Sequence, residues 1–237
     1  MEVLVAQDTD ITMPMNNLAS MRLFQLISPS LPTGAFTYSQ GLEWTIECGW
    51  VKDKKSLIEW LDSMLCFSFA ELEVPVLKRL YIASENNNLD LFNYWSNYIL
   101  ACRETKELRA EEVNRGRAMV KIIEQLDIEI DEEWLPSMQN CQLAGFTFMA
   151  SQWDISLEDA ALGYIWSWLE NMVMAAVKTI PLGQAAGQQV LAELSHTSTE
   201  NVMAGMDRND EALGGGCPAF AIASSLHETQ YTRLFRS

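Results

Sequence analysis

The stretch Ala160-Ala-Leu-Gly-Tyr-Ile-Trp-Ser-Trp-Leu-Glu-Asn-Met-Val-Met-Ala-Ala-Val177 decides the fold class of this chain. It contains a single charge, Glu170, and approaches the minimum length of a membrane-spanning helix. Ser167 and Asn171 interrupt the apolar run, however, and the chain has no second segment of this kind. The stretch therefore predicts the buried central helix of a globular protein. Ser156 and Asp159 form the capping box that opens this helix.

Helical periodicity extends over most of the chain. Apolar residues recur at three- and four-residue spacing, and no alternating run is long enough to build a sheet. The sequence therefore predicts an all-α fold, a single compact domain of about ten helices without a sheet. We expect this domain to cover residues 18–227, after a flexible leader (1–17) and before a C-terminal tail (228–237).

Turn and capping residues set the expected helix boundaries. The expected helices cover residues 18–27, about 37–48, a segment opened by a capping box of Ser56 and Glu59, a segment that begins or kinks at Pro75, residues 89–126 with any break at Gly116, 157–180, 183–196 and 218–227. Two segments are expected to lack helix. Residues 131–136 are predicted to be an acidic linker, and residues 197–216 a flexible loop that ends in three glycines.

The charge and the cysteines narrow the class of protein. Sixteen basic residues face thirty-two acidic ones, and the net charge of −16 has the wrong sign for binding nucleic acid or anionic lipid through a broad field. Five cysteines without a C-x-x-C pair indicate free thiols in a reducing compartment, and Glu2, Asp8 and Asp10 oppose the charge of a secretory or transit peptide. We therefore expect a cytoplasmic protein with protein or metal-ion partners.

The sequence motifs that mark common catalytic and metal-binding sites do not occur in this chain. It has two histidines, no H-E-x-x-H or C-x-x-C motif, no G-x-S-x-G elbow and no phosphate-binding G-x-x-x-x-G-K-[ST] loop. His227 could bind a transient metal with Glu228 and Cys217, but a polar residue at a helix end is the favoured interpretation. We therefore expect that the chain is not an enzyme, has no metal site and binds no cofactor stably.

The C-terminal tail has the composition of an interface. Tyr231, Leu234 and Phe235 stand beside Arg233 and Arg236, and large apolar side chains with guanidinium groups dominate protein interfaces. The sequence leaves open whether the tail binds a partner or docks on the chain's own core. A second polar contact site is plausible where Lys178 and Gln184 flank a proline turn.

Four blocks of the sequence resemble one family. The run Leu26-Ile-Ser-Pro-Ser-Leu-Pro-Thr-Gly-Ala-Phe-Thr-Tyr-Ser-Gln-Gly-Leu-Glu43 closely resembles the hallmark segment of the urease accessory proteins UreF. Residues 104–117, 177–188 and 227–237 agree with the family in order. The departures are modest: Thr33, Ala35 and Thr37 stand where small residues vary, and the acidic leader is rather long.

The resemblance implies a cytosolic, all-helical, non-enzymatic chaperone. It would form a homodimer and bridge UreD (also called UreH) and the GTPase UreG, so that the assembly docks on apo-urease and delivers nickel. Nickel would then be handled by the complex, and GTP would be bound by UreG. The alternative is a cytosolic nickel-binding carrier, although two histidines without clustered thiolates argue against tight binding.

The resemblance also implies where the partners bind. The tail would order when UreD binds and would lie near the segment around Tyr38. UreG would dock elsewhere on the dimer. The implied partner-binding residues are Tyr38, Gln40, Lys178, Pro181, Gly183, Gln184, His227, Glu228, Tyr231, Arg233, Leu234, Phe235, Arg236 and Ser237.

Overall fold

The computed structural model describes residues 17–237, so the predicted leader lies outside the described residues except for Asn17. Over this range the chain forms helices and connecting loops without a strand, which confirms the all-α prediction. The helices are α1 (Asn17–Ile27), α2 (Leu42–Glu47), α3 (Lys54–Met64), the π-helix η2 (Leu65–Glu73), α4 (Val74–Glu85), α5 (Leu89–Ala101), α6 (Lys106–Gln125), α7 (Leu135–Asn140), α8 (Gln142–Gln152), α9 (Leu157–Thr179), α10 (Gln184–Met206) and α11 (Pro218–His227), with short 3-10 helices η1 (Ala35–Thr37), η3 (Glu132–Trp134) and η4 (Asp210–Ala212).

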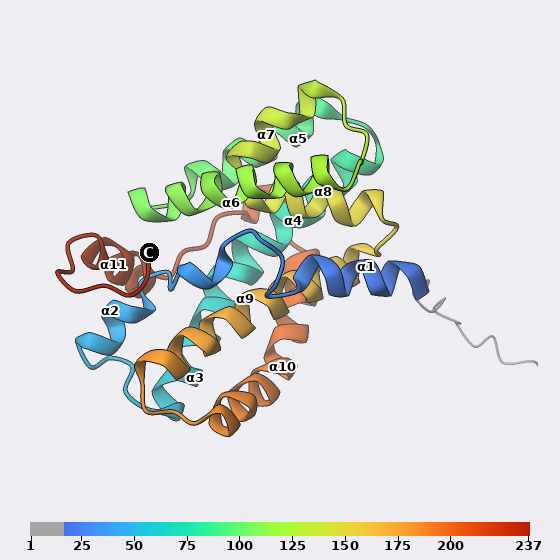
Figure 1. The fold of residues 1–237 in the computed structure, drawn as a ribbon. Helices are drawn as coiled ribbons and strands as arrows, with labels where there is room; N and C mark the ends of the chain where they lie inside the picture. Colours follow the sequence, from blue (N-terminus) through green and yellow to red (C-terminus); the bar gives the residue numbers. More distant parts are fainter. Residues whose placement is uncertain (1–16) are drawn as a thin grey trace, which may run out of the picture.

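The helices form one domain around α9 (Figure 1). Helices α5 to α8 lie on one side, α3 and α10 lie on the other, and α2 with α11 closes the end where the chain terminates. Helix α9 packs against α10, α1, α2 and α4. Its Ile165, Leu169, Met172 and Ala176 are almost completely buried, as expected for a central helix. None of the helices in residues 17–237 combines the length and the hydropathy needed to cross a bilayer.

Two predicted helix starts are wrong. Asp53, not Ser56, caps α3: its carboxylate accepts a hydrogen bond from Ser56 N at 2.9 Å, and the Ser56 hydroxyl accepts one from Asp53 N at 3.1 Å. The helix expected from residue 37 starts only at Leu42, because Gln40 and Gly41 both have left-handed backbone angles, with φ of +53° and +83°.

The break in residues 89–126 also lies elsewhere. It falls between Ala101 and Lys106, where Thr105 caps α6 by accepting from Leu108 N at 3.2 Å. Gly116 lies inside α6, where the helix approaches α7 so closely that a Cβ would come within 2.5 Å of the Met138 carbonyl oxygen. The glycine therefore serves close packing rather than a helix end.

Two segments expected to lack helix are partly helical. The acidic linker at 131–136 contains η3 and the start of α7, because Trp134 is buried against Phe92. The loop at 197–216 begins only after Met206. Ser198 and Asn201 satisfy their side chains within α10 by donating to the carbonyls of residues four positions earlier, at 2.8 and 2.9 Å. Polar composition alone therefore misplaced this boundary.

Candidate partner-docking site

The C-terminal tail is docked on the chain's own domain. Ser39 N donates to the carbonyl oxygen of Ser237 at 2.8 Å, the Ser39 hydroxyl donates to the same oxygen at 2.6 Å, and Arg236 N donates to the carbonyl of Thr37 at 2.8 Å. The tail and the segment near Tyr38 thus lie together, as the resemblance implies. Phe235 and Ser237 are buried.

The carboxylate of Glu43 binds the main chain of the tail through two hydrogen bonds. Its Oε1 accepts from Leu234 N at 2.7 Å, and its Oε2 accepts from Phe235 N at 3.1 Å. Glu43 lies in the first turn of α2 and is itself buried. A buried carboxylate is costly unless hydrogen bonds replace its water shell, and the two tail amides are such donors.

His227 joins α11 to two other helices. Its Nδ1 lies 2.7 Å from Glu107 Oε2 on α6, and its Nε2 lies 3.3 Å from Glu43 Oε2 on α2. The imidazole is completely buried. Glu107 also pairs with Arg233 of the tail through its other oxygen, and Glu107 N donates to the Glu228 carboxylate at 3.1 Å. These contacts fix both ends of the segment between α11 and Phe235.

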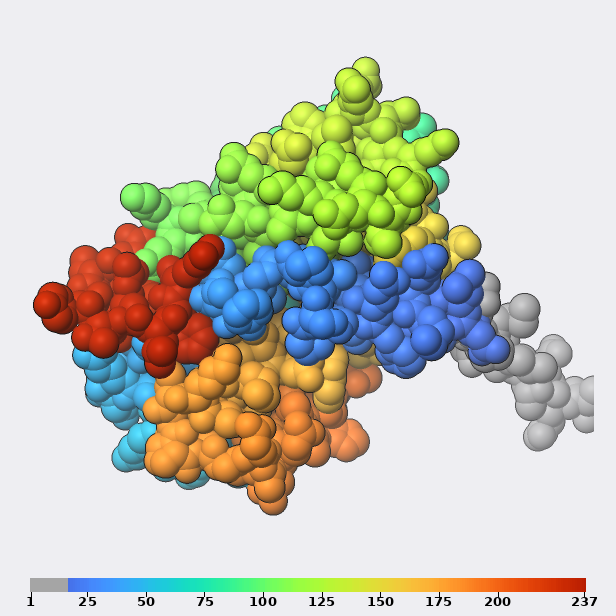
Figure 2. Space-filling model, viewed as in Figure 1, coloured from blue at the N-terminus to red at the C-terminus, as the bar shows by residue number. Residues whose placement is uncertain are grey.

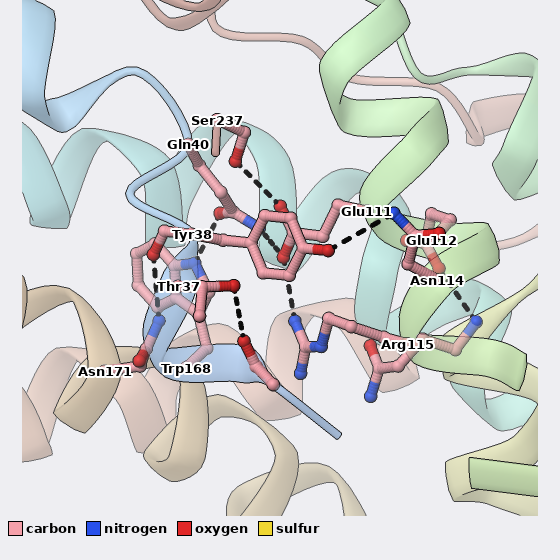
Figure 3. Close-up of polar contacts among 12 residues, drawn as sticks. Thr37, Tyr38, Gln40, Glu111, Glu112, Asn114, Arg115, Trp168, Asn171 and Ser237 are labelled. Carbon is pink, nitrogen blue, oxygen red and sulfur yellow. Dashed lines mark hydrogen bonds and ion pairs between the residues drawn. The ribbon is translucent and has the colours of Figure 1, made fainter. Parts of the chain in front are cut away.

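Gln40 and Glu111 connect the tail to the centre of the molecule (Figure 3). Gln40 Nε2 donates to Glu111 Oε1 at 3.0 Å, while Gln40 Oε1 accepts from the indole of Trp168 on α9 at 2.8 Å. Glu111 also accepts from Arg115 at 2.9 Å and, through Oε2, from the Ser237 hydroxyl at 3.2 Å. The strained left-handed backbone of Gln40 is therefore held by bonds to α6 and α9.

Tyr38 is part of the support rather than of the surface. Its ring is buried, its carbonyl oxygen accepts from Asn171 at 3.2 Å, and its hydroxyl accepts from Asn114 at 3.4 Å (Figure 3). Tyr38 has extended backbone angles and does not lie in the first turn of a helix. Its side chain anchors the segment that binds Ser237.

A second buried ionic cluster lies beside Glu111. Arg103 bridges Glu73 and Glu112 at 2.6 and 2.7 Å. Burial opposes the charge of this guanidinium, but Glu112 and Glu73 outweigh it and raise the pKa of Arg103. Burial also raises the pKa of Glu111, against the opposing effect of Arg115. Through Arg103 the cluster connects the end of η2 to α6.

The residues around Lys178 form a separate surface. Lys178 lies in the last turn of α9, and Pro181, Gly183 and Gln184 form the exposed turn into α10. In Figure 1 this turn lies below α2, whereas the tail lies above it. Lys178 and Gln40 nevertheless line one cavity of about 310 Å³ between residues 26–36, α6, α8 and α9.

Nothing in the described residues forms a resident metal site. No group of three or more His, Cys, Asp or Glu side chains in residues 17–237 has a geometry that could hold a metal ion. The candidate site consists of the docked tail, the turn between α9 and α10, and the buried residues that bind the tail. It brings together three of the four sequence blocks that carried the resemblance: residues 26–43, 104–117 and 227–237.

Comparison with known proteins shows which family the chain is similar to. The UreF family model matches residues 51–195. A urease accessory protein UreF from Alcanivorax borkumensis is 50% identical over 229 residues, covering 94% of this chain and all of the relative. A UreF from Pseudomonas putida strain W619 is 47% identical, and one from Alkalilimnicola ehrlichii is 43% identical, over 94% and 93% of this chain and 99% and 96% of those proteins. The chain belongs to the UreF family.

The sequence alone did not identify the groups that hold the UreF tail in place. Glu43, Glu107 and Glu111 all lie in blocks that carried the resemblance, but Glu107 and Glu111 stand among many other charged residues between 103 and 117, and no local pattern marks them as buried. The sequence does not show whether an individual glutamate is buried or exposed. The available signal was the position of Glu43, two residues after the Gln40-Gly41 turn.

Replacing Glu43 tests its role in the UreF tail. Glu43→Gln exchanges one acceptor oxygen for an amide that itself donates, so one tail N–H loses its partner. We expect the free energy of unfolding to fall by about 1–3 kcal/mol and carboxypeptidase to remove the tail faster. The matched control is Glu124→Gln at an exposed position of α6, which should change neither. Equal urea midpoints for the two variants would contradict the role assigned to Glu43.

Proposed function

We propose that this chain is a non-enzymatic urease accessory protein that bridges a UreD-like protein and a UreG-like GTPase, so that the complex inserts nickel into apo-urease. The docked tail is the observation that supports this most. Its main chain is bound to Glu43 and residues 37–39, while Tyr231 is fully exposed and Leu234 is largely exposed. Apolar side chains on a preorganised main chain suit the binding of a protein partner, because less ordering is needed on binding.

We assign the tail surface to the UreD-like partner. Ile222 and Leu226 of α11 are also about half exposed, so α11 and the tail together offer four large apolar side chains. Surfaces of this kind on a soluble chain mark interaction sites. Tyr38, Gln40 and the buried residues His227, Phe235 and Ser237 support this surface from inside.

The turn between α9 and α10 is assigned to the UreG-like partner. Lys178 and Gln184 are exposed there on either side of Pro181, and Lys178 forms no ion pair within residues 17–237. A lysine in the last helical turn is favoured by the helix dipole, so its position alone does not establish a contact. The chain lacks a nucleotide loop, and GTP is accordingly assigned to the partner.

We assign the homodimer interface to the exposed face of α1. Met21 and Phe24 lie one turn apart on this helix, both are more than half exposed, and Phe36 is exposed as well. Nickel is the cargo of the assembly rather than a ligand of this chain. Tight stoichiometric nickel binding by the isolated chain, measured by calorimetric titration, would favour the carrier alternative instead.

Removing the exposed apolar groups of the tail should abolish one interaction only. Tyr231→Ala with Leu234→Ala leaves the main-chain bonds intact, so we expect an unchanged melting temperature and no co-purification with the UreD-like protein. The control removes two exposed apolar groups elsewhere, Ile82→Ala with Met203→Ala, and should retain the complex. If the tail variant still binds UreD as tightly as the wild type, the assignment of this surface is wrong.

Variants of the α9–α10 turn should separate the two partners. Lys178→Ala and Gln184→Ala should keep the fold and the UreD complex but reduce UreG recruitment or alter GTP turnover during urease activation. Lys55→Ala, an exposed lysine of α3, is the control. Unchanged recruitment and activation in both turn variants would leave the turn with a structural role alone.

A further inference from the structure

Helix α6 exposes a row of basic side chains. Lys106, Arg117 and Lys121 are exposed and lie on one side of the helix, since 117 and 121 are one turn apart and 106 lies three turns before 117. None of the three forms an ion pair within residues 17–237, although the chain has twice as many acidic as basic residues.

The opposite side of α6 explains why these cations have no partners. Glu111 and Glu112 point into the molecule, where they pair with Arg115 and Arg103 and accept from Gln40 and Gln142 N. The buried acids of this helix are thus occupied by buried cations. Its exposed side chains include four cations, Lys106, Arg109, Arg117 and Lys121, and one acid, Glu124, which is a local excess of positive charge in a chain of net charge −16.

An open groove adjoins this row at Arg117 and Lys121. It has a volume of about 420 Å³ and lies between α6 and Pro32. Its lining includes Arg117, Lys121 and the side-chain amides of Asn114 and Gln125, with Ala118 and Ile122 as its apolar part. Cations and amides in one groove can bind carboxylates and main-chain groups of an extended segment.

The groove lies next to the support of the tail. Asn114 lines it and also donates to the Tyr38 hydroxyl at 3.4 Å. Figure 2 shows α6 (green), the segment around residues 28–40 (blue) and the C-terminal tail (red) on one face of the molecule. Arg236, exposed on the tail, adds a further cation that forms no ion pair within the described range.

The charge of the whole chain limits what can bind here. A dense polyanion such as nucleic acid would be repelled by the surrounding negative field, and the row has no exposed aromatic side chain on which a base could stack. A protein segment with a few carboxylates is attracted by the local row of cations and is repelled less by the net negative charge of the chain than a dense polyanion is. An acidic protein segment therefore fits this surface best.

We propose that the row Lys106, Arg117 and Lys121, with the adjoining groove, is a docking surface for an acidic segment of a partner protein. This surface goes beyond the tail and the α9–α10 turn assigned above. Its test needs none of the urease proteins, so it can fail while the proposed function stands, and the reverse.

The test uses a ten-residue peptide with three glutamates spaced by glycine and serine, and NMR spectra of the ¹⁵N-labelled full chain. At about 20 mM salt we expect saturable shifts confined to α6 and the residues around Pro32, and at about 200 mM salt at least tenfold weaker binding because screening shortens the range of the attraction. Arg117→Glu with Lys121→Glu should abolish these shifts.

The control has the same net charge as this variant. Lys52→Glu with Lys55→Glu also lowers the net charge by four units, but at exposed positions outside α6, and should bind the peptide within about twofold of the wild type. The absence of saturable binding, equal loss in both double variants, or shifts scattered over the surface would overturn the proposal. Tighter binding of a ten-nucleotide single-stranded DNA than of the peptide would overturn it too, in favour of a nucleic-acid site.

Discussion

The buried carboxylate of Glu43 is the constraint on which the docking site depends. Removed from water, it needs hydrogen-bond donors, and Leu234 N and Phe235 N supply them, while Nε2 of His227 lies 3.3 Å from the same carboxylate. Binding two successive amides fixes the direction of the tail, so that Phe235 is buried while Leu234 faces solvent. The same carboxylate therefore determines which side chains the tail can offer to a partner.

Buried and partly buried glutamates of α6 connect the tail to the core of the domain. Glu107 and Glu111 of α6 bind the tail at Arg233 and Ser237, and Gln40 connects Glu111 to Trp168 of α9. Removing one member of a buried charged network leaves its partner unsatisfied, which costs more than the bond itself contributes. We infer that the UreF fold positions the tail as a consequence of how its helices pack. The exposed cations of α6 have the same origin, because Glu111 and Glu112 of that helix face inward.

Local patterns predicted some of these features and missed others. The capping box at Ser156 and the apolar run that follows predicted α9, and Pro218 and the apolar residues after it predicted α11. Gly116 and the polar stretch after Thr197 misled, since close packing on α7 and side-chain bonds within α10 outweigh local preference. The composition of the tail indicated an interface but left its docking open. That docking depends on Glu43, which lies 191 residues before Leu234, and no local pattern contains such a contact.

A tail that is docked before any partner binds differs from one that orders on binding, and amide hydrogen exchange distinguishes the two. In the wild-type chain without partners, the amides of Ser39, Leu234, Phe235 and Arg236 should exchange at least ~100-fold more slowly than those of exposed Tyr231 and Thr232. If all six exchange at the rate of an unstructured peptide, the carboxylate of Glu43 does not hold the tail, and the docking surface forms only with the partner.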